Sequence, residues 1–243
     1  MNKLYVVGIG PGAADAMTAR AMRALEVSQV IAGYGVYTDL VCPLFPDKVY
    51  LETPMRQEAE RCRMAIDAAL SGQTVAMISS GDAGVYGMAG LVYEMAEGNR
   101  GLDIEVVPGV TAALSGAAVL GAPLGHDFAV ISLSDLLTPW ATIEKRLEMM
   151  AEADLCMAIY NPSSSRRANH LMKACDILLR RISPETVCGA VRNIARDGET
   201  MHVMPLARLR EYKADMFTTV FVGNSQTRVI DGKMVTPRGY KHG

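Results

Sequence analysis

The sequence predicts an α/β protein built from two domains, residues 1–120 and 126–243. Three observations favour this fold class. Short apolar runs alternate with longer amphipathic stretches along the whole chain, a pattern typical of strands alternating with helices. Turns rich in glycine or proline follow most of the apolar runs. The segment Gly-Ala-Pro-Leu-Gly at 121–125 indicates a joint between domains. With 243 residues, 50% of them hydrophobic, the chain has ample material for a packed core.

In the first half, strands are expected where apolar residues suited to a buried strand run together. Helices are expected where apolar residues recur every three or four positions, as in the stretch that follows the first strand. The expected strands are 4–9, 27–32, 49–51, 74–78 and 103–107. The other expected helices are 56–70, 91–96 and 112–120.

The second half repeats the alternation of strands and helices without any internal repeat of 20 to 50 residues. Its expected strands are 128–133, 155–160, 186–191 and 216–222. Its expected helices are 143–153 and 169–181. Several of these strands end in short polar segments, such as Ser134-Asp135 and Asn161-Pro162. Polar residues at strand ends are typical of ligand sites in α/β proteins.

The stretch Ser79–Gly90 is the strongest local signal of a ligand site. It leaves an apolar strand through a glycine-rich turn and enters a helix, so that a ligand can approach backbone without meeting a Cβ atom. Asp82 lies in the turn, where its carboxylate could accept hydrogen bonds from ribose hydroxyls or hold the amino group of a cationic ligand. The alternative is that the glycines only shape a tight turn and Asp82 caps the helix. The stretch alone indicates a small-molecule pocket.

The opening Gly8-Ile9-Gly10-Pro11-Gly12 has the start of a dinucleotide-binding fingerprint. Such a loop points backbone amides at a pyrophosphate, and proline has no amide to donate. Pro11 therefore makes nicotinamide-dependent oxidoreduction only a weak alternative.

Composition excludes several other classes. A net charge of −2 does not favour nucleic-acid binding. The five cysteines contain no C-x-x-C pair, so that neither a metal site nor a disulfide framework is expected, and scattered thiols suit a reducing cytoplasm. The amino terminus is not typical of a targeting leader, and no apolar run reaches the ~20 residues of a membrane-spanning helix. We expect a cytoplasmic protein with no membrane partner.

Taken together, three glycine-containing motifs resemble the tetrapyrrole methylases, which use S-adenosylmethionine. These motifs are Gly8–Gly12, Ser80–Gly87 and Pro108–Ala112. Within that family, further stretches resemble the members that methylate C17 of precorrin-3B or cobalt-factor III. They are His126–Phe128, Ser132–Trp140, Tyr160–Pro162, Val222–Asn224 and Thr236–Tyr240. The resemblance covers essentially the whole chain.

The resemblance implies a two-domain α/β fold of the class III methyltransferases, with the active-site cleft between domains, and commonly a homodimer. It implies methylation at C17 of precorrin-3B or cobalt-factor III, coupled to ring contraction in cobalamin biosynthesis, with S-adenosylmethionine as cofactor and S-adenosylhomocysteine as product. The alternatives are a methylase of this fold acting at another corrin ring carbon, or a nonenzymatic tetrapyrrole carrier. Whether the substrate already holds cobalt stays open.

The resemblance also implies that the cofactor is held mainly by backbone at strand ends. The residues that match are Pro11, Gly81, Asp82, Val85, Tyr86, Thr111, Ala112, Asn161, Ala190 and Thr218. Each lies at or just past an expected strand end, where α/β proteins build their sites. For Thr111 the alternative is a helix N-cap, and for Ala190 and Thr218 it is ordinary packing.

Methyl transfer from a sulfonium to an electron-rich carbon needs alignment and desolvation more than acid or base help. Ring contraction requires that protons move, which favours a general acid or base. The candidate catalytic residues bracket one strand at the domain joint: His126, Asp127, Ser134 and Asp135. The alternatives are a structural histidine at 126 and an Asp135 that caps the following turn.

A tetrapyrrole with many carboxylates requires cationic partners, and arginine pairs with carboxylates most effectively. The arginines beside expected loops or strand ends that we assign to substrate binding are Arg56, Arg166 and Arg192, with Arg167 and Arg238 as further candidates. The alternative for any one of them is a solvated surface charge.

Overall fold

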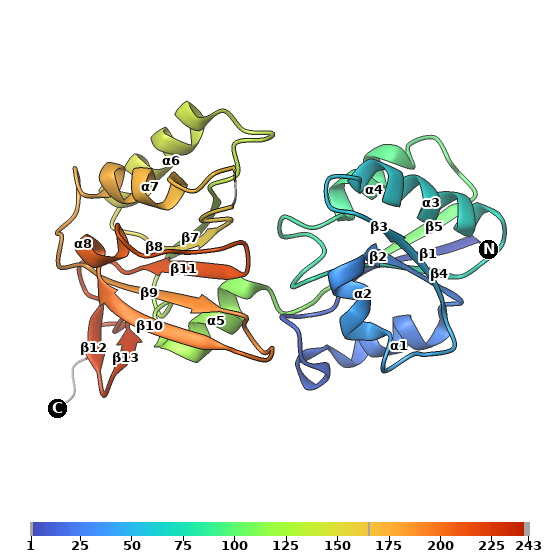
Figure 1. Ribbon diagram of the computed structural model, residues 1–243, viewed down its shortest axis with the longest axis horizontal. Helices are drawn as coiled ribbons and strands as arrows, with labels where there is room; N and C mark the ends of the chain where they lie inside the picture. Colours follow the sequence, from blue (N-terminus) through green and yellow to red (C-terminus); the bar gives the residue numbers. More distant parts are fainter. Residues whose placement is uncertain (1, 165, 241–243) are drawn as a thin grey trace. The chain divides into compact units, whose positions relative to one another are not determined.

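A computed structural model describes residues 2–164 and 166–240. The chain divides into two compact units, residues 1–112 and 113–243. Each unit contains a five-stranded sheet with helices packed on it, which confirms the α/β class (Figure 1).

The first unit is a doubly wound parallel sheet. Its strands are β1 (Asn2–Gly8), β2 (Val30–Tyr34), β3 (Val49–Thr53), β4 (Val75–Ser79) and β5 (Leu102–Val107). Its helices are α1 (Ala19–Val27), α2 (Gly35–Val41), α3 (Glu58–Leu70) and α4 (Ala89–Met95), with a short 3-10 turn at Ala14–Ala16. The strand order is β3-β2-β4-β1-β5, and every pairing is parallel. The carboxyl ends of β4, β1 and β5 are therefore neighbours.

Two cores cover the two faces of this sheet, because alternate strand residues point to opposite sides. Leu4, Val6 and Met77 pack with buried residues of α3 and α4. Val7 and Ile78 pack with buried residues of α1 and α2. Strand β4 is buried along its whole length, as its apolar sequence predicts for a central parallel strand.

The second unit has a mixed sheet and a small three-stranded sheet. Its strands are β6 (Gly121–Ala122), β7 (Phe128–Ser132), β8 (Cys156–Tyr160), β9 (Val187–Arg192), β10 (Thr200–Pro205), β11 (Thr218–Val222), β12 (Arg228–Ile230) and β13 (Lys233–Val235). Its helices are α5 (Ala112–Leu120), α6 (Trp140–Glu152), α7 (His170–Leu178) and α8 (Leu206–Leu209). The strand orders are β10-β9-β11-β8-β7 and β12-β13-β6. Strands β7 and β8 are parallel, with Ser132 opposite Tyr160, so that their carboxyl ends lie side by side.

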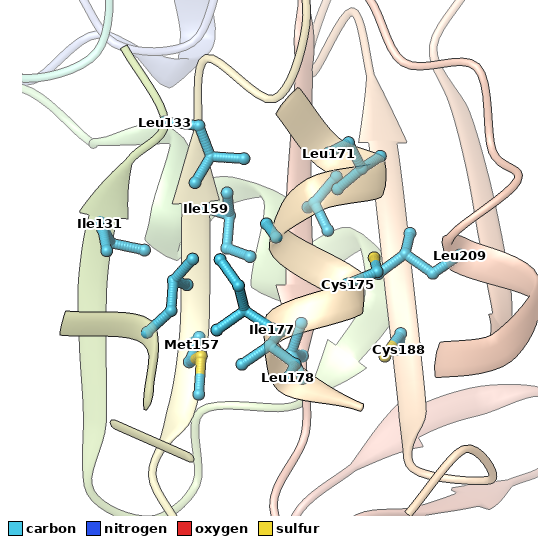
Figure 2. Packing of buried hydrophobic residues seen from close by; sticks show 14 of the residues in the cluster. Ile131, Leu133, Met157, Ile159, Leu171, Cys175, Ile177, Leu178, Cys188 and Leu209 are labelled. Atoms are coloured by element: carbon cyan, nitrogen blue, oxygen red, sulfur yellow. The ribbon is translucent and has the colours of Figure 1, made fainter. Parts of the chain in front are cut away.

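Figure 2 shows the hydrophobic core of this unit, where Ile131, Met157 and Ile159 of the sheet face Leu171 and Cys175 of α7. Helix α5 packs on the sheet's other face. A Cβ on its Gly116 would meet the Phe221 ring at 2.9 Å, and a Cβ on Gly189 of β9 would meet the Leu120 side chain at 2.6 Å. These contacts hold α5 against the sheet of the second unit, which begins at residue 113.

The expected strand at 27–32 is wrong at its start. Val27 is the last residue of α1 and is 56% exposed. The Ser28 hydroxyl donates to the Ala24 carbonyl at 2.7 Å, which ends the helix there, and β2 begins at Val30. The apolar run at 27–32 therefore covers the end of α1 and the start of β2. Hydrophobic periodicity in a short window does not separate two such elements.

Candidate functional site

Four glycines bring three strand ends of the first unit into backbone contact, and we call them the glycine junction: Gly8, Gly10, Gly81 and Gly109. The Gly10 amide donates to the Gly81 carbonyl at 3.0 Å, and the Gly81 amide donates to the Gly10 carbonyl at 2.7 Å. A Cβ on Gly109 would lie 2.2 Å from the Gly81 oxygen and 2.5 Å from the Gly8 oxygen. The segments after β1, β4 and β5 can approach this closely only because side chains are missing.

Asp82 fastens the glycine junction. Its Oδ1 accepts from the Gly84 amide at 2.8 Å, and its Oδ2 accepts from the Gly109 amide at 2.9 Å, so that the carboxylate bridges the loops after β4 and β5. A carboxylate offers about four acceptor positions, so that ligand hydroxyls can still donate to it. The turn role and the ligand role that the sequence left as alternatives are therefore compatible.

The other residues expected to hold the cofactor in the first unit lie around this junction. The Cβ position of Gly81 is 3.5 Å from the Thr111 Cα and 3.6 Å from the Ala112 nitrogen. Pro11 is buried directly after Gly10, and Val85 is half-buried in the turn after Asp82. Tyr86 has a φ of 54° and is 55% exposed. The structure brings this group together at one edge of the sheet.

The three residues expected to hold the cofactor in the second unit differ in what they can offer. Asn161 follows β8 with a φ of 52°, and its Nδ2 donates to the Ser132 hydroxyl at 2.9 Å. Ala190 is fully buried among core side chains, so that it has only backbone to offer a ligand. Thr218 is 3% exposed, and its hydroxyl donates to Asp215 at 2.8 Å.

A polar cluster occupies the carboxyl ends of β7 and β8, and we define it by its members: Ser132, Ser134, Asp135, Asn161, Arg167 and His170. The Ser134 amide donates to the Ser132 hydroxyl at 3.1 Å. Arg167 donates from Nη1 to the Ser134 hydroxyl. His170 Nε2 lies 3.0 Å from Asp135 Oδ2.

The electrostatics of the cluster favour an ionised Asp135. The hydrogen bond from His170 is the largest cause that holds the pKa of Asp135 below its usual range, and burial opposes it. The Arg167 charge also lowers the pKa of Asp135. At neutral pH the carboxylate can therefore accept a proton but has none to give.

The expected catalytic residues fall at two places. Ser134 and Asp135 belong to the polar cluster, whereas His126 and Asp127 precede β7 and lie at its opposite end. The side chains of His126 and Asp127 are 50% and 88% exposed. A five-residue strand is roughly 16 Å long, so that the two pairs do not form one constellation.

The comparisons with known proteins agree with these features. A family profile described as "Tetrapyrrole (Corrin/Porphyrin) Methylases" matches residues 3–210. The chain belongs to the tetrapyrrole methylase family. It is a methyltransferase of that family, as the names of its relatives also indicate.

Among the relatives of this tetrapyrrole methylase, a Salmonella typhimurium protein named "Probable cobalt-factor III C(17)-methyltransferase" is 48% identical over 98% of this chain and 99% of its own length. The "Cobalt-factor III methyltransferase" of Priestia megaterium is 46% identical over 99% of this chain, which spans only 45% of that longer protein. A "Precorrin-3B C(17)-methyltransferase" of Sinorhizobium sp is 41% identical over 98% of this chain and 96% of its own length. A crystal structure of the methyltransferase CobJ matches with a TM-score of 0.90 and 36% identity, over 96% of this chain and 99% of that one.

The arginines of this methylase are not equivalent as substrate partners. Arg192 Nε lies 2.6 Å from Asp215, which neutralises its charge and raises the pKa of the guanidinium. Arg56 and Arg166 are exposed, and Arg56 has a φ of 72°. Arg167 is half-buried between the Ser134 and Ser164 hydroxyls and forms no ion pair with any carboxylate in the described part of the chain. Its charge is thus the one available to an anionic ligand in the polar cluster.

Within the described residues, we also considered the cysteine thiols and the side chains that could bind a metal ion. Four of the five cysteines are buried; burial raises the pKa of Cys62 to about 11 and that of Cys175 to about 12, so that both stay protonated. Across residues 2–164 and 166–240, no three His, Cys, Asp or Glu side chains are grouped to hold a metal ion. Over the same residues, no helix has the length and apolar character needed to cross a membrane.

His170 was not among the candidate site residues from the sequence, although its place in a strand-to-helix connection could have identified it. His170 opens α7, the helix that follows the strand-end segment at 161–169. A search of every strand-to-helix connection for titratable side chains includes this residue.

Proposed function

We propose that this chain transfers a methyl group from S-adenosylmethionine to C17 of cobalt-factor III, with contraction of the macrocycle, in cobalamin biosynthesis. The observation that carries the proposal is the 48% identity, over nearly the full length of both chains, with a relative named for this activity. Precorrin-3B is the second candidate substrate, because a relative at 41% identity is named for it.

The glycine junction fits the cofactor. A backbone surface with a carboxylate beside it suits the ribose and amino groups of an adenosyl amino acid, since carbonyls and carboxylates accept hydrogen bonds from both. The residues that would hold it in the first unit are Pro11, Gly81, Asp82, Val85, Tyr86, Thr111 and Ala112. In the second unit, Asn161 and the backbone at Ala190 and Thr218 are the candidates. S-adenosylmethionine supplies a methyl group on a sulfonium, so that the acceptor gains one positive charge with the methyl group.

The polar cluster fits the macrocycle. Arg167 offers a substrate carboxylate a guanidinium that forms no ion pair within the described residues, and arginine binds carboxylates with two parallel hydrogen bonds. Ser134 and Asp135 lie beside it. His126 and Asp127 stay proposals for a separate contact at the other end of β7. Arg56, Arg166 and Arg192 stay proposals for outer contacts with substrate carboxylates.

The test is a single-turnover incubation without oxygen. Purified protein, S-adenosylmethionine and either cobalt-factor III or precorrin-3B are mixed, and products are followed by mass spectrometry and absorption. We expect the cobalt compound to gain one methyl group and its macrocycle spectrum to change with ring contraction. A methyl group on only the metal-free compound would favour the second candidate. No methyl transfer to either compound, with calorimetry still showing bound cofactor, contradicts the C17 activity.

We also propose that the chain works as a homodimer in the cytoplasm. The family resemblance supports the dimer, and scattered unpaired cysteines support a reducing compartment. Sedimentation velocity of the purified protein tests the first point, since a monomer at micromolar concentration contradicts it.

A further inference from the structure

Two neighbouring side chains hold the imidazole of His170 in the polar cluster. It is 8% exposed, and its Nε2 contacts Asp135 Oδ2 at 3.0 Å. The Trp140 ring meets its imidazole edge-on, with ring centroids 4.8 Å apart. Two independent contacts therefore fix the orientation of the imidazole. The Asp135 side chain is in contrast 36% exposed, so that the buried ring holds a carboxylate which faces outward.

The protonation states of the pair follow from hydrogen-bond chemistry. An ionised carboxylate only accepts hydrogen bonds, so that Nε2 of His170 carries a proton and donates it toward Asp135. Three further groups surround the pair. Arg167 adds positive charge beside Asp135, Trp140 is neutral, and the Lys173 ammonium lies 5.6 Å from the centroid of the Trp140 ring. The surroundings thus favour the ionised form of the carboxylate.

We propose that His170 is a positioning residue for Asp135, and that the Asp135 carboxylate takes up the proton which the methylated macrocycle loses. The proposal rests on the proposed function. When a ring carbon forms its new bond to the methyl group, the macrocycle supplies the electron pair and gains one positive charge, while the bond from the methyl group to the sulfonium sulfur breaks and its electron pair stays on the sulfur of S-adenosylhomocysteine. Loss of one proton from the macrocycle restores its charge. That proton bonds to Asp135, which becomes a neutral carboxylic acid and later releases the proton to water through its exposed side.

The geometry favours this pair over the other histidine and carboxylate that the sequence singled out. His126 Nδ1 lies 3.8 Å from Asp127 Oδ2, beyond hydrogen-bond reach, and accepts instead from the Asp127 backbone amide at 3.0 Å; both side chains are at least half exposed. The His126 ring therefore does not orient the Asp127 carboxylate, whereas general base catalysis requires a fixed direction. The His170–Asp135 pair meets that requirement.

Three variants test the proposal: Asp135→Asn, His170→Ala and His170→Gln. Asp135→Asn is expected to lower kcat by about 100-fold or more, the usual range for a lost general base. His170→Ala is expected to lower kcat by about tenfold with KM for the macrocycle unchanged, because an unheld carboxylate points correctly only part of the time. Glutamine places an amide N–H near the position of Nε2, so that His170→Gln is expected to recover most of the loss. His202→Gln, on the exposed edge of β10, is the matched control.

Two readouts separate positioning from a merely structural role. In the double variant His170→Ala with Asp135→Asn, no further loss beyond Asp135→Asn is expected, since His170 acts through the carboxylate. Carbon-13 NMR of the Asp135 carboxyl in the free protein is expected to show its pKa rising when His170 is replaced by alanine, and the acid limb of kcat/KM should move to higher pH with it.

Two results would contradict a positioning role for His170. A folded His170→Ala variant with wild-type kcat and an unmoved acid limb overturns the proposal, as do losses that multiply in the double variant. If His170→Ala does not fold, the same NMR titration and kinetics on His170→Gln decide, with near wild-type values supporting the proposal and an Asp135→Asn-like loss opposing it. If the wild-type protein methylates neither substrate, the proposed function fails first, and the inference fails with it even where NMR detects the pair.

Discussion

The glycine junction and the polar cluster are both candidate ligand sites at strand ends, but the first is made of backbone and the second of side chains. Both lie at the carboxyl ends of parallel strands, where α/β proteins place their ligands. The glycine junction is made of backbone, and its shape depends on side chains that are absent. The polar cluster is made of side chains, and its shape depends on hydrogen bonds among them. We therefore expect added side-chain atoms to disrupt the glycine junction, and the removal of hydrogen-bond donors or acceptors to disrupt the polar cluster.

The largest expected effect is steric, at the glycine junction. Gly109→Ala places a Cβ 2.2 Å from the Gly81 oxygen, with backbone on both sides that has no room to move. We expect the free energy of unfolding to fall by about 3 kcal/mol or more, beyond the usual range for overpacking. Urea denaturation followed by circular dichroism measures it.

Gly90→Ala is the matched control for that substitution. Gly90 lies in α4, and nothing stands within 4 Å of its Cβ position. Alanine stabilises a helix by up to about 1 kcal/mol relative to glycine, so that this variant should be at least as stable as the wild type. If both alanines have equal effects, the contacts at the junction do not limit stability and the comparison fails.

The next effect is chemical and separates the two roles of Asp82. In Asp82→Asn, one carboxylate oxygen becomes an amide nitrogen, so that either the Gly84 amide or the Gly109 amide loses its acceptor. We expect a loss of about 1 kcal/mol in unfolding free energy, the usual net worth of one hydrogen bond, because neither amide is fully buried. We also expect S-adenosylmethionine to bind about tenfold more weakly, as measured by calorimetry. Asp67→Asn, on the exposed side of α3, is the control. Unchanged affinity with lowered stability would leave Asp82 with the turn role alone.

How much of each region the sequence could predict depends on how local its contacts are. The glycine junction was predictable, because each motif follows its own strand and the glycines signal close backbone approach without any knowledge of pairing. In the polar cluster, Ser134 and Asp135 were predictable by the same strand-end rule. The contact of Asp135 with His170 spans 35 residues and depends on the parallel pairing of β7 with β8. No short window of sequence contains that information, which is why His126 drew attention as the histidine nearest in sequence.

A third prediction sharpens the comparison within the second unit. Arg167→Gln is expected to raise KM for the carboxylated macrocycle by about tenfold, because it removes a guanidinium that forms no ion pair with any described carboxylate. Arg192→Gln is expected to change KM by less than about twofold, since Asp215 already neutralises Arg192. Steady-state kinetics on both variants decides. The reverse order of effects would move the substrate carboxylates from the polar cluster to the carboxyl end of β9.

The smallest expected effect is a pH dependence that only the polar cluster should show. Because His170 holds the pKa of Asp135 below its ordinary value of 3.8, the unfolded chain binds the proton more readily than the folded one. The stabilisation is therefore complete above about pH 4, and it is lost as pH falls from there through the folded pKa. Since the Asp135 side chain is 36% exposed, we expect less than about 1 kcal/mol. Unfolding free energies of the wild type and Asp135→Asn, measured from pH 7 downward, should converge as the pH falls from about 4 through the folded pKa of Asp135. A difference that persists at lower pH would mean that Asp135 stabilises the loop through its shape and not through its charge.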